Sequence, residues 1–275
     1  MVSRKPSDVI RYVTVRILSS LDGSENWSGS GTGFMYLFKR GENTFPAIIT
    51  NRHVIDDIKR IGITFHITED GNTSPVPGPG KIISLGIEDI YYIFHPNNSI
   101  DLVMIALSPI MDYAKYNLGY DIYVQCLHND YIPSCDDIKN LSSIEDIIMA
   151  GYPNNISDTE NNFPIVRKGI TATPLSSNYK GQKVFLIDMA IYGGSSGSPV
   201  FLITEGSWMN NGEMKFGVRF FLLGVLYAGH IRNSEHMLQI KKVPTYNGPY
   251  IKIEEMLNLG LCIKSEIIEE FSLLI

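Results

Sequence analysis

The stretch Tyr-Gly-Gly-Ser-Ser-Gly-Ser-Pro at residues 192–199 is the part of the sequence that decides the fold. Glycines around the serines favour unusual backbone dihedrals and leave a serine hydroxyl unshielded. Such a turn can aim successive backbone N–H groups at one point, which makes an anion-binding nest. Taken by itself, the stretch is more typical of a flexible Gly/Ser surface loop, so a chemical role needs support from the rest of the chain.

Two further residues can complete a nucleophilic site around one of these serines. A serine nucleophile needs a neighbouring imidazole as base, and the imidazole needs a carboxylate that fixes its tautomer. His53 follows a predicted strand and a short Thr-Asn-Arg turn, where a side chain can face a cleft. Asp101 directly precedes the apolar run 102–107, so it is expected to be partly buried and to need a partner. A strand-start cap is the alternative interpretation of Asp101.

These three segments resemble motifs of the trypsin-like (chymotrypsin-fold) serine proteases. Residues 50–53, Thr-Asn-Arg-His, resemble the family's Thr-Ala-Ala-His turn, and residues 101–105, Asp-Leu-Val-Met-Ile, resemble its Asp-Ile-Ala-Leu-Leu strand. Residues 194–199, Gly-Ser-Ser-Gly-Ser-Pro, resemble its Gly-Asp-Ser-Gly-Gly-Pro motif, which places the nucleophile at Ser196 and not at Ser195. The separations of 48 and 95 residues between the functional residues of the three motifs suit two sequential β-barrels.

The resemblance implies a role for each of these residues. Ser196 would attack the peptide carbonyl, His53 would serve as general base and then general acid, and Asp101 would hold His53 and stabilise the imidazolium. The N–H groups of Gly194 and Ser196 would form the oxyanion hole. The implied function is a serine endopeptidase that acts on polypeptides through an acyl-enzyme, with no metal and no organic cofactor.

The bacterial high-temperature-requirement branch of the family resembles the chain more closely. Residues 31–34 (Gly-Thr-Gly-Phe), 149–153 (Met-Ala-Gly-Tyr-Pro) and 188–191 (Asp-Met-Ala-Ile) are similar to its Gly-Ser-Gly-Phe, Ala-Ile-Gly-Asn-Pro and Asp-Ala-Ala-Ile segments. Residues 224–229 (Gly-Val-Leu-Tyr-Ala-Gly) are similar to the strand that lies beside substrate. Only 46 residues follow Gly229, so the peptide-binding PDZ domain of that branch is not expected.

Two positions depart from the family pattern. Ser195 stands where secreted members carry the acid that pairs with a new N-terminus, so activation by N-terminal clipping is not expected. Ser198 replaces the second glycine of the motif, at a position that must stay small. All three triad residues are present, which favours an enzyme over a protease-fold binding module. A latent effector that needs a regulatory protein partner is a further alternative.

The primary specificity pocket is expected to form from residues 190–193 and 227–229. Ala190 stands six residues before the predicted nucleophile, where members that cleave after Lys or Arg carry an acid. A desolvated Lys or Arg side chain without a counter-ion is strongly disfavoured. With Ala190, Tyr227 and Gly229 in its walls, the pocket should prefer small or medium apolar side chains, and Tyr227 should limit its depth.

The composition excludes several other classes of protein. Lys and Arg number 23 against 29 Asp and Glu, so a net charge of −6 gives no global attraction to nucleic acid or an anionic membrane. No apolar stretch reaches the roughly 18 residues of a membrane helix, and the N-terminal residues lack the apolar core of a secretory signal. Cys126, Cys135 and Cys262 cannot build a disulfide framework and show no zinc-binding spacing. We therefore expect free thiols and a cytoplasmic location.

Short segments rich in Val, Ile, Tyr and Phe recur along the chain and predict strands, the first at residues 9–17. A helical spacing of apolar residues emerges only near the C-terminus, beginning with Ile253, Met256 and Leu257. We therefore expect an all-β protein of two packed antiparallel β-barrels with a C-terminal helical segment. The expected boundaries are 1–112 for the barrel with His53 and Asp101, 113–245 for the barrel with Ser196, and 246–275 for the helical tail, with a linker at 108–127.

Overall fold

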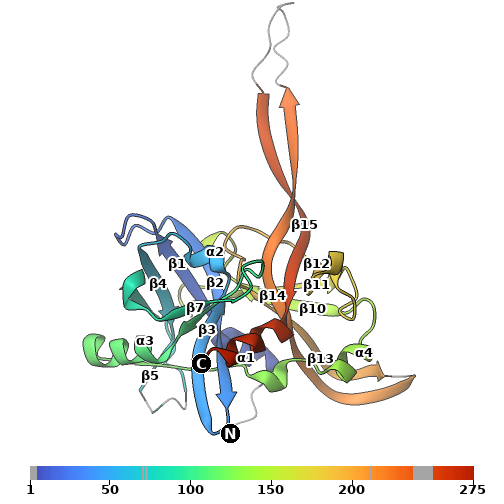
Figure 1. Cartoon of the computed structure of the whole chain (residues 1–275), viewed down its shortest axis with the longest axis horizontal. Helices are drawn as coiled ribbons and strands as arrows, with labels where there is room; N and C mark the ends of the chain where they lie inside the picture. The colour runs from blue at the N-terminus through green and yellow to red at the C-terminus, as the bar shows by residue number, and fades with distance from the viewer. Residues whose placement is uncertain (1–4, 70, 72–73, 211, 238–249) are drawn as a thin grey trace, which may run out of the picture.

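The computed structural model describes residues 5–69, 71, 74–210, 212–237 and 250–275 of the chain. These residues form two antiparallel β-structures that lie side by side, at the left and the right of Figure 1. The expected all-β architecture with a small C-terminal helical segment is confirmed. In chain order the elements are α1 (Pro6–Val13), β1 (Thr14–Ser20), β2 (Gly29–Arg40), β3 (Asn43–Thr50), α2 (Arg52–Ile55), β4 (Arg60–Phe65), β5 (Ile67–Thr68), β6 (Lys81–Gly86), η1 (Ile87–Asp89), β7 (Tyr92–Phe94), β8 (Val103–Ala106), α3 (Ser108–Tyr113), η2 (Ala114–Leu118), β9 (Asp121–Ile122), η3 (Asn129–Tyr131), α4 (Cys135–Lys139), β10 (Asp146–Gly151), η4 (Pro153–Asn155), β11 (Ile165–Thr171), η5 (Tyr179–Gly181), β12 (Val184–Asp188), β13 (Pro199–Asn210), β14 (Glu213–Met237), β15 (Tyr250–Lys264) and η6 (Ser265–Leu273).

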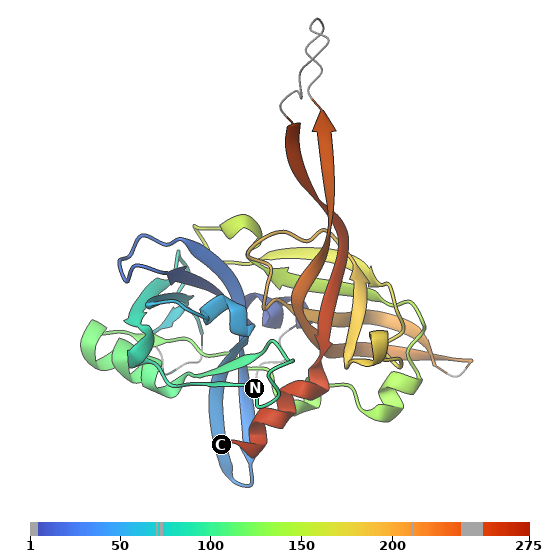
Figure 2. The same ribbon diagram turned by 45° about the horizontal axis from the view of Figure 1, so that its top comes forward.

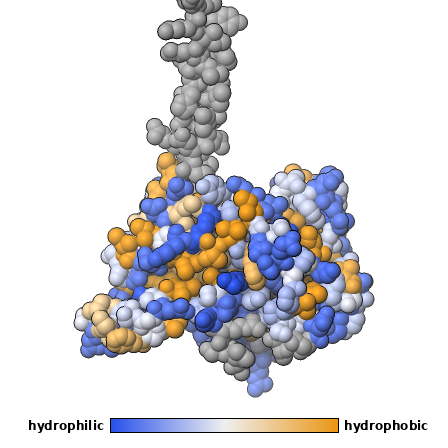
Figure 3. Space-filling view, turned by 180° about the vertical axis from the view of Figure 1, so that it is seen from behind, coloured by the Kyte–Doolittle hydropathy of each residue, from blue (hydrophilic) through white to orange (hydrophobic). Residues whose placement is uncertain are grey.

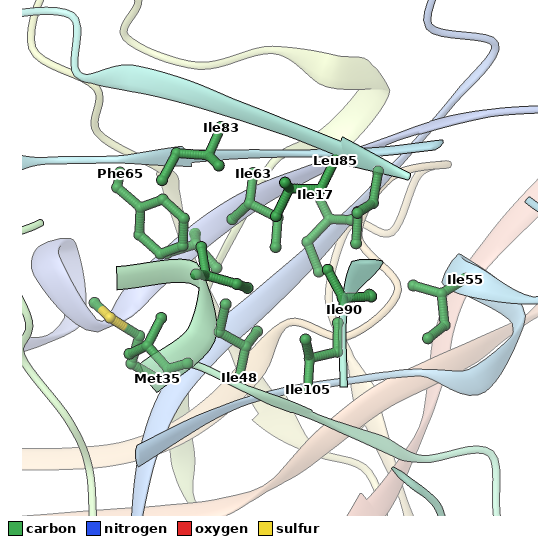
Figure 4. Close-up of a cluster of buried hydrophobic side chains, with 14 of the residues drawn as sticks. Ile17, Met35, Ile48, Ile55, Ile63, Phe65, Ile83, Leu85, Ile90 and Ile105 are labelled. Atoms are coloured by element: carbon green, nitrogen blue, oxygen red, sulfur yellow. The ribbon is translucent and has the colours of Figure 1, made fainter. Parts of the chain in front are cut away.

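The N-terminal β-structure is a seven-stranded sheet in the order β6-β4-β1-β2-β3-β8-β7, curled into a half-barrel. Its two edge strands, β6 and β7, follow each other in the chain and are connected through η1. Apolar side chains fill its interior, including Ile17, Met35, Ile48 and Phe65, each at most 1% exposed (Figure 4). β-Branched residues such as these isoleucines pack well on a pleated surface, which gives the neighbouring strand ends a rigid base.

The C-terminal β-structure is a closed six-stranded barrel in the order β10-β11-β12-β15-β14-β13. Met149, Phe185, Leu202 and Leu223 belong to the buried cluster that fills it. Closure leaves no unpaired sheet edge. The loop that carries Ser196 enters this barrel through β13.

A third buried cluster joins the two β-structures. It contains Phe34 of the half-barrel, Phe201 of the closed barrel and Phe271 of η6. Figure 2 shows η6, in dark red, running back from the barrel to the half-barrel. The Tyr36 hydroxyl bonds to the carboxylate of Glu269 on this helix. The C-terminal segment therefore holds the two β-structures together.

Residues 6–13 form the helix α1, although a strand was expected from residue 9. Pro6 lies at the start of the helix. A backbone N–H at this position has no partner within the helix, so proline costs no hydrogen bond there. Val9, Ile10 and Val13 are buried, and their spacing places them on one helical face. The strand β1 begins only at Thr14.

The apolar residues from Ile253 to Leu257 lie in strand β15, not in the expected helix. β15 pairs with both β12 and β14, so it is the strand that closes the barrel. Pairing between distant segments outweighs the local spacing of apolar residues here. The C-terminal helical structure is limited to η6, which is a 3₁₀ helix.

The segment between the two β-structures, expected as a linker at residues 108–127, contains α3, η2 and β9. β9 pairs with β5, and Leu127 exchanges backbone hydrogen bonds with β2, donating to Met35 and accepting from Leu37. This segment therefore covers the half-barrel before the chain continues to β10. Cys126, Cys135 and Cys262 are unpaired, as expected.

Two hairpins project from the closed barrel. The β13–β14 hairpin, at the lower left of Figure 3, exposes the side chains of Met209, Met214, Phe216 and Val218. The β14–β15 hairpin rises at the top of Figure 1. Of the helices in the described ranges, none combines the length and the apolar character that crossing a membrane requires.

Candidate active site

His53 and Asp101 meet at one end of two paired strands. His53 lies in α2 directly after β3, Asp101 precedes β8, and these strands pair antiparallel up to Thr50 and Val103. Asp101 contacts His53 twice: Oδ2 lies 2.5 Å from Nδ1, and Oδ1 accepts the backbone N–H at 3.1 Å. These two contacts orient the ring, and a proton on Nδ1 leaves Nε2 able to accept one.

Asn51 supports this pair from the interior. Its side chain is fully buried, and its amide Nδ2 donates to the backbone carbonyl of Asp101 at 2.8 Å. A buried polar group that loses its hydrogen-bond partner cannot bond to water instead, so the folded state loses the full desolvation free energy of that group. Asn51 therefore fixes the backbone from which the Asp101 carboxylate projects.

The loop that carries Ser196 is tied to the half-barrel by Thr32 of β2. The Thr32 N–H donates to the carbonyl of Ser196 at 2.8 Å, and Thr32 Oγ1 donates to the carbonyl of Gly194 at 2.9 Å. The Thr32 carbonyl in turn accepts a bond from Thr50 Oγ1 at 2.7 Å. Thr50 ends the strand that leads to His53, so Thr32 connects the Ser196 loop with the His53 turn.

Two glycines allow this close approach. Gly197 has φ of +84°, and a Cβ on it would lie 1.9 Å from the carbonyl oxygen of Thr32. Gly194 has φ of +81°, and a Cβ on it would lie 2.5 Å from the carbonyl oxygen of Tyr152. Both positions therefore require glycine for the backbone dihedral and for space.

The backbone N–H groups of Gly194 and Ser196 make no hydrogen bond within the part of the chain that the structure describes. The Gly193 carbonyl accepts the Asn154 N–H at 2.6 Å. Because a trans peptide places its C=O and N–H on opposite sides, the Gly194 N–H points away from Asn154. Two unbonded N–H groups beside one serine can bind an anion.

The Ser196 side chain is half-buried, and His53 is exposed. Among the described residues, the Ser196 hydroxyl forms no hydrogen bond, and the His53 ring bonds only to Asp101. Hydrogen bonds between a catalytic base and nucleophile are often long before substrate binds. The hydroxyl and Nε2 are therefore both available to a substrate.

Arg167 of β11 contacts the same loop from the interior of the closed barrel. Its Nη2 donates to Ser195 Oγ at 2.7 Å, and its Nη1 donates to the carbonyl of Ala190. Ser195 is fully buried, and the guanidinium carbon lies 5.7 Å from the centre of the Tyr192 ring. Burial lowers the pKa of Arg167.

Comparison with known proteins identifies the family of the chain. Residues 31–209 match the trypsin-like peptidase domain family. The chain belongs to this family. It is therefore a serine-protease-type peptidase, a hydrolase whose substrate is a polypeptide. No curated protein matches the sequence.

Two solved structures of the M. tuberculosis protease Rv3671c are similar to this trypsin-like peptidase. The inactive form is 12% identical, with 96% of this chain and 88% of that chain covered and a TM-score of 0.46. The active form is 11% identical, with 96% and 80% covered and a TM-score of 0.44.

The residues predicted to line the specificity pocket divide into two groups in this peptidase. Gly229 pairs with Gly260 of β15, and a Cβ on Gly260 would lie 2.4 Å from Ile191 Cδ1. Ile191 follows Ala190, which is half-buried. The structure therefore brings the segment after Ala190 against the strands that contain Gly229 and Gly260.

Tyr227 lies elsewhere. It lines a cavity of about 350 Å³ together with Asp101, Ile100 and Ile263. Burial and the nearby Asp101 carboxylate raise the pKa of the Tyr227 phenol. Tyr227 thus faces the side of the site on which Asp101 lies, which gives no support to its predicted role in limiting the depth of a pocket at Ala190.

Sequence reasoning did not identify Thr32, Asn51 or Arg167 as parts of the site. Thr32 and Asn51 lie inside the quoted motifs, but nothing in those motifs separates a buried hydroxyl or amide from an exposed one. Arg167 gave no such signal, because a charged residue between Val166 and Lys168 is expected to face solvent, and only the structure shows it at an inward position of β11 between two exposed neighbours. No three His, Cys, Asp or Glu side chains of the described ranges gather as a metal site would require.

Proposed function

We propose that the protein is a serine endopeptidase that hydrolyses peptide bonds through an acyl-enzyme on Ser196. The double contact of Asp101 with His53, at a turn that Thr32 links to the Ser196 loop, carries the proposal. Membership of the trypsin-like peptidase family supports it.

In the proposed reaction, Ser196 Oγ attacks the peptide carbonyl while His53 Nε2 takes the hydroxyl proton. Asp101 accepts the Nδ1–H bond throughout and stabilises the imidazolium. The oxyanion of the tetrahedral intermediate binds the N–H groups of Gly194 and Ser196. His53 then gives its proton to the leaving amine, and the C–N bond breaks. Water, activated by His53, hydrolyses the acyl-enzyme and restores the Ser196 hydroxyl.

The proposal includes a preference for small or medium apolar residues before the cleaved bond. Ala190 and Ile191 carry no charge, and Ile191 packs close to Gly260, so these two side chains offer a Lys or Arg side chain no counter-ion. A peptide-library cleavage profile tests this preference. Dominant cleavage after Lys or Arg would contradict it, because no acid stands at Ala190 to pair with those side chains.

We also propose that the protein is related to the high-temperature-requirement branch. We propose that it acts in a reducing compartment such as the cytoplasm. The short motif matches support the branch, and the three unpaired cysteines support the compartment. A regulatory protein partner is required only if the purified chain proves latent.

Replacement of the nucleophile tests the proposed function most simply. Ser196→Ala should abolish peptide hydrolysis and leave the unfolding temperature nearly unchanged, because a half-exposed hydroxyl contributes little to packing. Ser195→Ala is the comparison variant: it removes the neighbouring hydroxyl and should keep measurable hydrolysis at a lower kcat, because Ser195 Oγ accepts a bond from Arg167. Activity that survives in Ser196→Ala but vanishes in Ser195→Ala would move the nucleophile by one residue, and activity that survives both would refute the mechanism.

A further inference from the structure

Arg167 is a charged side chain that the proposed mechanism leaves unused, although it contacts the loop on which that mechanism depends. It lies on the inward face of β11 and donates to Ser195 Oγ and to the carbonyl of Ala190. These two acceptors lie at opposite ends of the segment 190–195. One guanidinium therefore holds both ends of the segment that leads to Ser196.

Ion pairing does not explain the presence of this arginine. Both of its acceptors are uncharged, and no carboxylate among the described residues pairs with it. A partly buried cation without a counter-ion is unfavourable, so its position calls for another role. A guanidinium presents several N–H groups in a fixed plane, which suits two acceptors that must be held at one separation.

The segment that Arg167 holds contains one N–H of the candidate oxyanion hole. Within it, Asn154 binds the Gly193 carbonyl, Thr32 binds the Gly194 carbonyl, and the Ser195 N–H donates to Tyr192 at 3.1 Å. These contacts fix backbone groups, whereas Arg167 fixes the buried Ser195 side chain and the Ala190 carbonyl. Without it, the segment would keep these backbone contacts and lose the bonds to the Ala190 carbonyl and to the Ser195 hydroxyl.

We infer that Arg167 is a positioning residue that keeps the segment 190–195 in the conformation able to bind an oxyanion, without a contribution from a newly formed N-terminus. This inference rests on the proposed function. The positive charge of Arg167 near the loop also stabilises the negative charge that develops on the substrate carbonyl. Because Arg167 acts through Ser195 and Ala190, its loss should lower kcat more than it raises KM.

Four variants of the full chain separate the parts of this role. Arg167→Met removes the charge and both bonds, Arg167→Gln keeps a neutral donor, and Arg167→Lys keeps the charge but not the planar guanidinium. Arg219→Met is the matched control. Arg219 is a partly buried arginine of the same barrel that bonds to Thr204 and Glu145, away from the loop.

Hydrogen–deuterium exchange of residues 190–196, kcat and KM are measured for each folded variant. In Arg167→Met, exchange in this segment should be at least about 10-fold faster and kcat about 10- to 100-fold lower, with KM changed less than about threefold. Arg167→Lys should recover part of kcat, and Arg219→Met should change neither exchange in the segment nor kcat. If the Met variant does not fold, the Gln and Lys variants provide the same comparison.

Unchanged exchange and kcat in a folded Arg167 variant would overturn the inference, as would an equal loss in Arg219→Met. A fall in kcat/KM that comes entirely from KM would also overturn it, because it would place Arg167 in substrate binding. Failure of the proposed function has a different signature: the unmodified chain would hydrolyse no peptide, and the exchange comparison would still decide whether Arg167 holds the loop.

Discussion

The two halves of the candidate site are held in different ways. On the half-barrel, the His53 ring is exposed and oriented mainly by two contacts with Asp101. On the closed barrel, the segment up to Ser196 is held by contacts from Thr32, Asn154 and Arg167. The acid–base pair thus lies at two strand ends of the half-barrel, whereas the nucleophile loop is held by residues of both β-structures.

This difference predicts how substitutions will act. Changes in the His53–Asp101 pair should alter catalysis and leave stability almost untouched. Changes in the contacts of the nucleophile loop should alter both, because these contacts bury polar groups and those of Thr32 also join the two β-structures.

Asp101→Asn should have the largest effect on catalysis. An amide at this position cannot favour the proton on Nδ1, so His53 would be held in the wrong tautomer, and kcat should fall about 10⁴-fold. The unfolding temperature should change little, since Asn retains the shape and the acceptor for the His53 N–H. Steady-state kinetics together with thermal unfolding measures both, and a stability loss as large as that of the loop variants would contradict the comparison.

Gly197→Ala should have the largest effect on stability. The new Cβ would lie 1.9 Å from the Thr32 carbonyl oxygen, so the interface between the β-structures must move, at a cost of about 4 kcal/mol or more. Gly119→Ala is the matched control, because Gly119 has a similar φ of +78° and open space around it. The control should lose only about 1 kcal/mol. Equal losses in urea unfolding would show that backbone strain, and not the contact with Thr32, sets the requirement for glycine.

Thr32→Val should affect both properties to a moderate degree. It removes the hydroxyl that donates to the Gly194 carbonyl and accepts the Tyr152 N–H at 3.1 Å, which leaves a half-buried carbonyl and a buried N–H without that partner. We expect a loss of about 2 to 3 kcal/mol in stability and about a 10-fold lower kcat. Thr32→Ser keeps the hydroxyl and should retain most of the stability and most of kcat. If Thr32→Val changes neither the free energy of unfolding nor kcat, the two β-structures are not coupled through this hydroxyl.

The smallest expected effect concerns His66, a buried histidine of the half-barrel. His66 is buried among aromatic rings, including those of Tyr12 and Phe163, and burial lowers its pKa to about 4. Between about pH 6.5 and pH 4 the unfolded chain binds a proton that the folded chain does not, so stability should fall by about 2 kcal/mol as pH decreases through this range. His66→Phe should flatten this part of the pH–stability curve by that amount. Parallel curves for the two proteins in urea unfolding would show that His66 is not the group that titrates.

The sequence predicts the fold for a physical reason, and the structure brings the predicted His53 and Asp101 into contact. Glycine, proline and the polar residues at strand ends are locally constrained, so the motifs around His53, Asp101 and Ser196 can be recognised without the fold. The contacts that support them are not local. Thr32 and Arg167 matter because strands distant in sequence bring them to residues 190–196, and β15 is a strand because the barrel needs a partner for β12 and β14. No pattern within a single segment encodes such pairings.

The central claim is that Ser196 is a nucleophile activated within the intact chain. The measurement that tests it most directly is mass spectrometry of the full-length protein, with Met1 present, after reaction with a fluorophosphonate probe. The account predicts one adduct per chain, mapped by peptide analysis to Ser196, on a protein that has not been clipped. An adduct on Ser195, or labelling that begins only after removal of N-terminal residues, would contradict it.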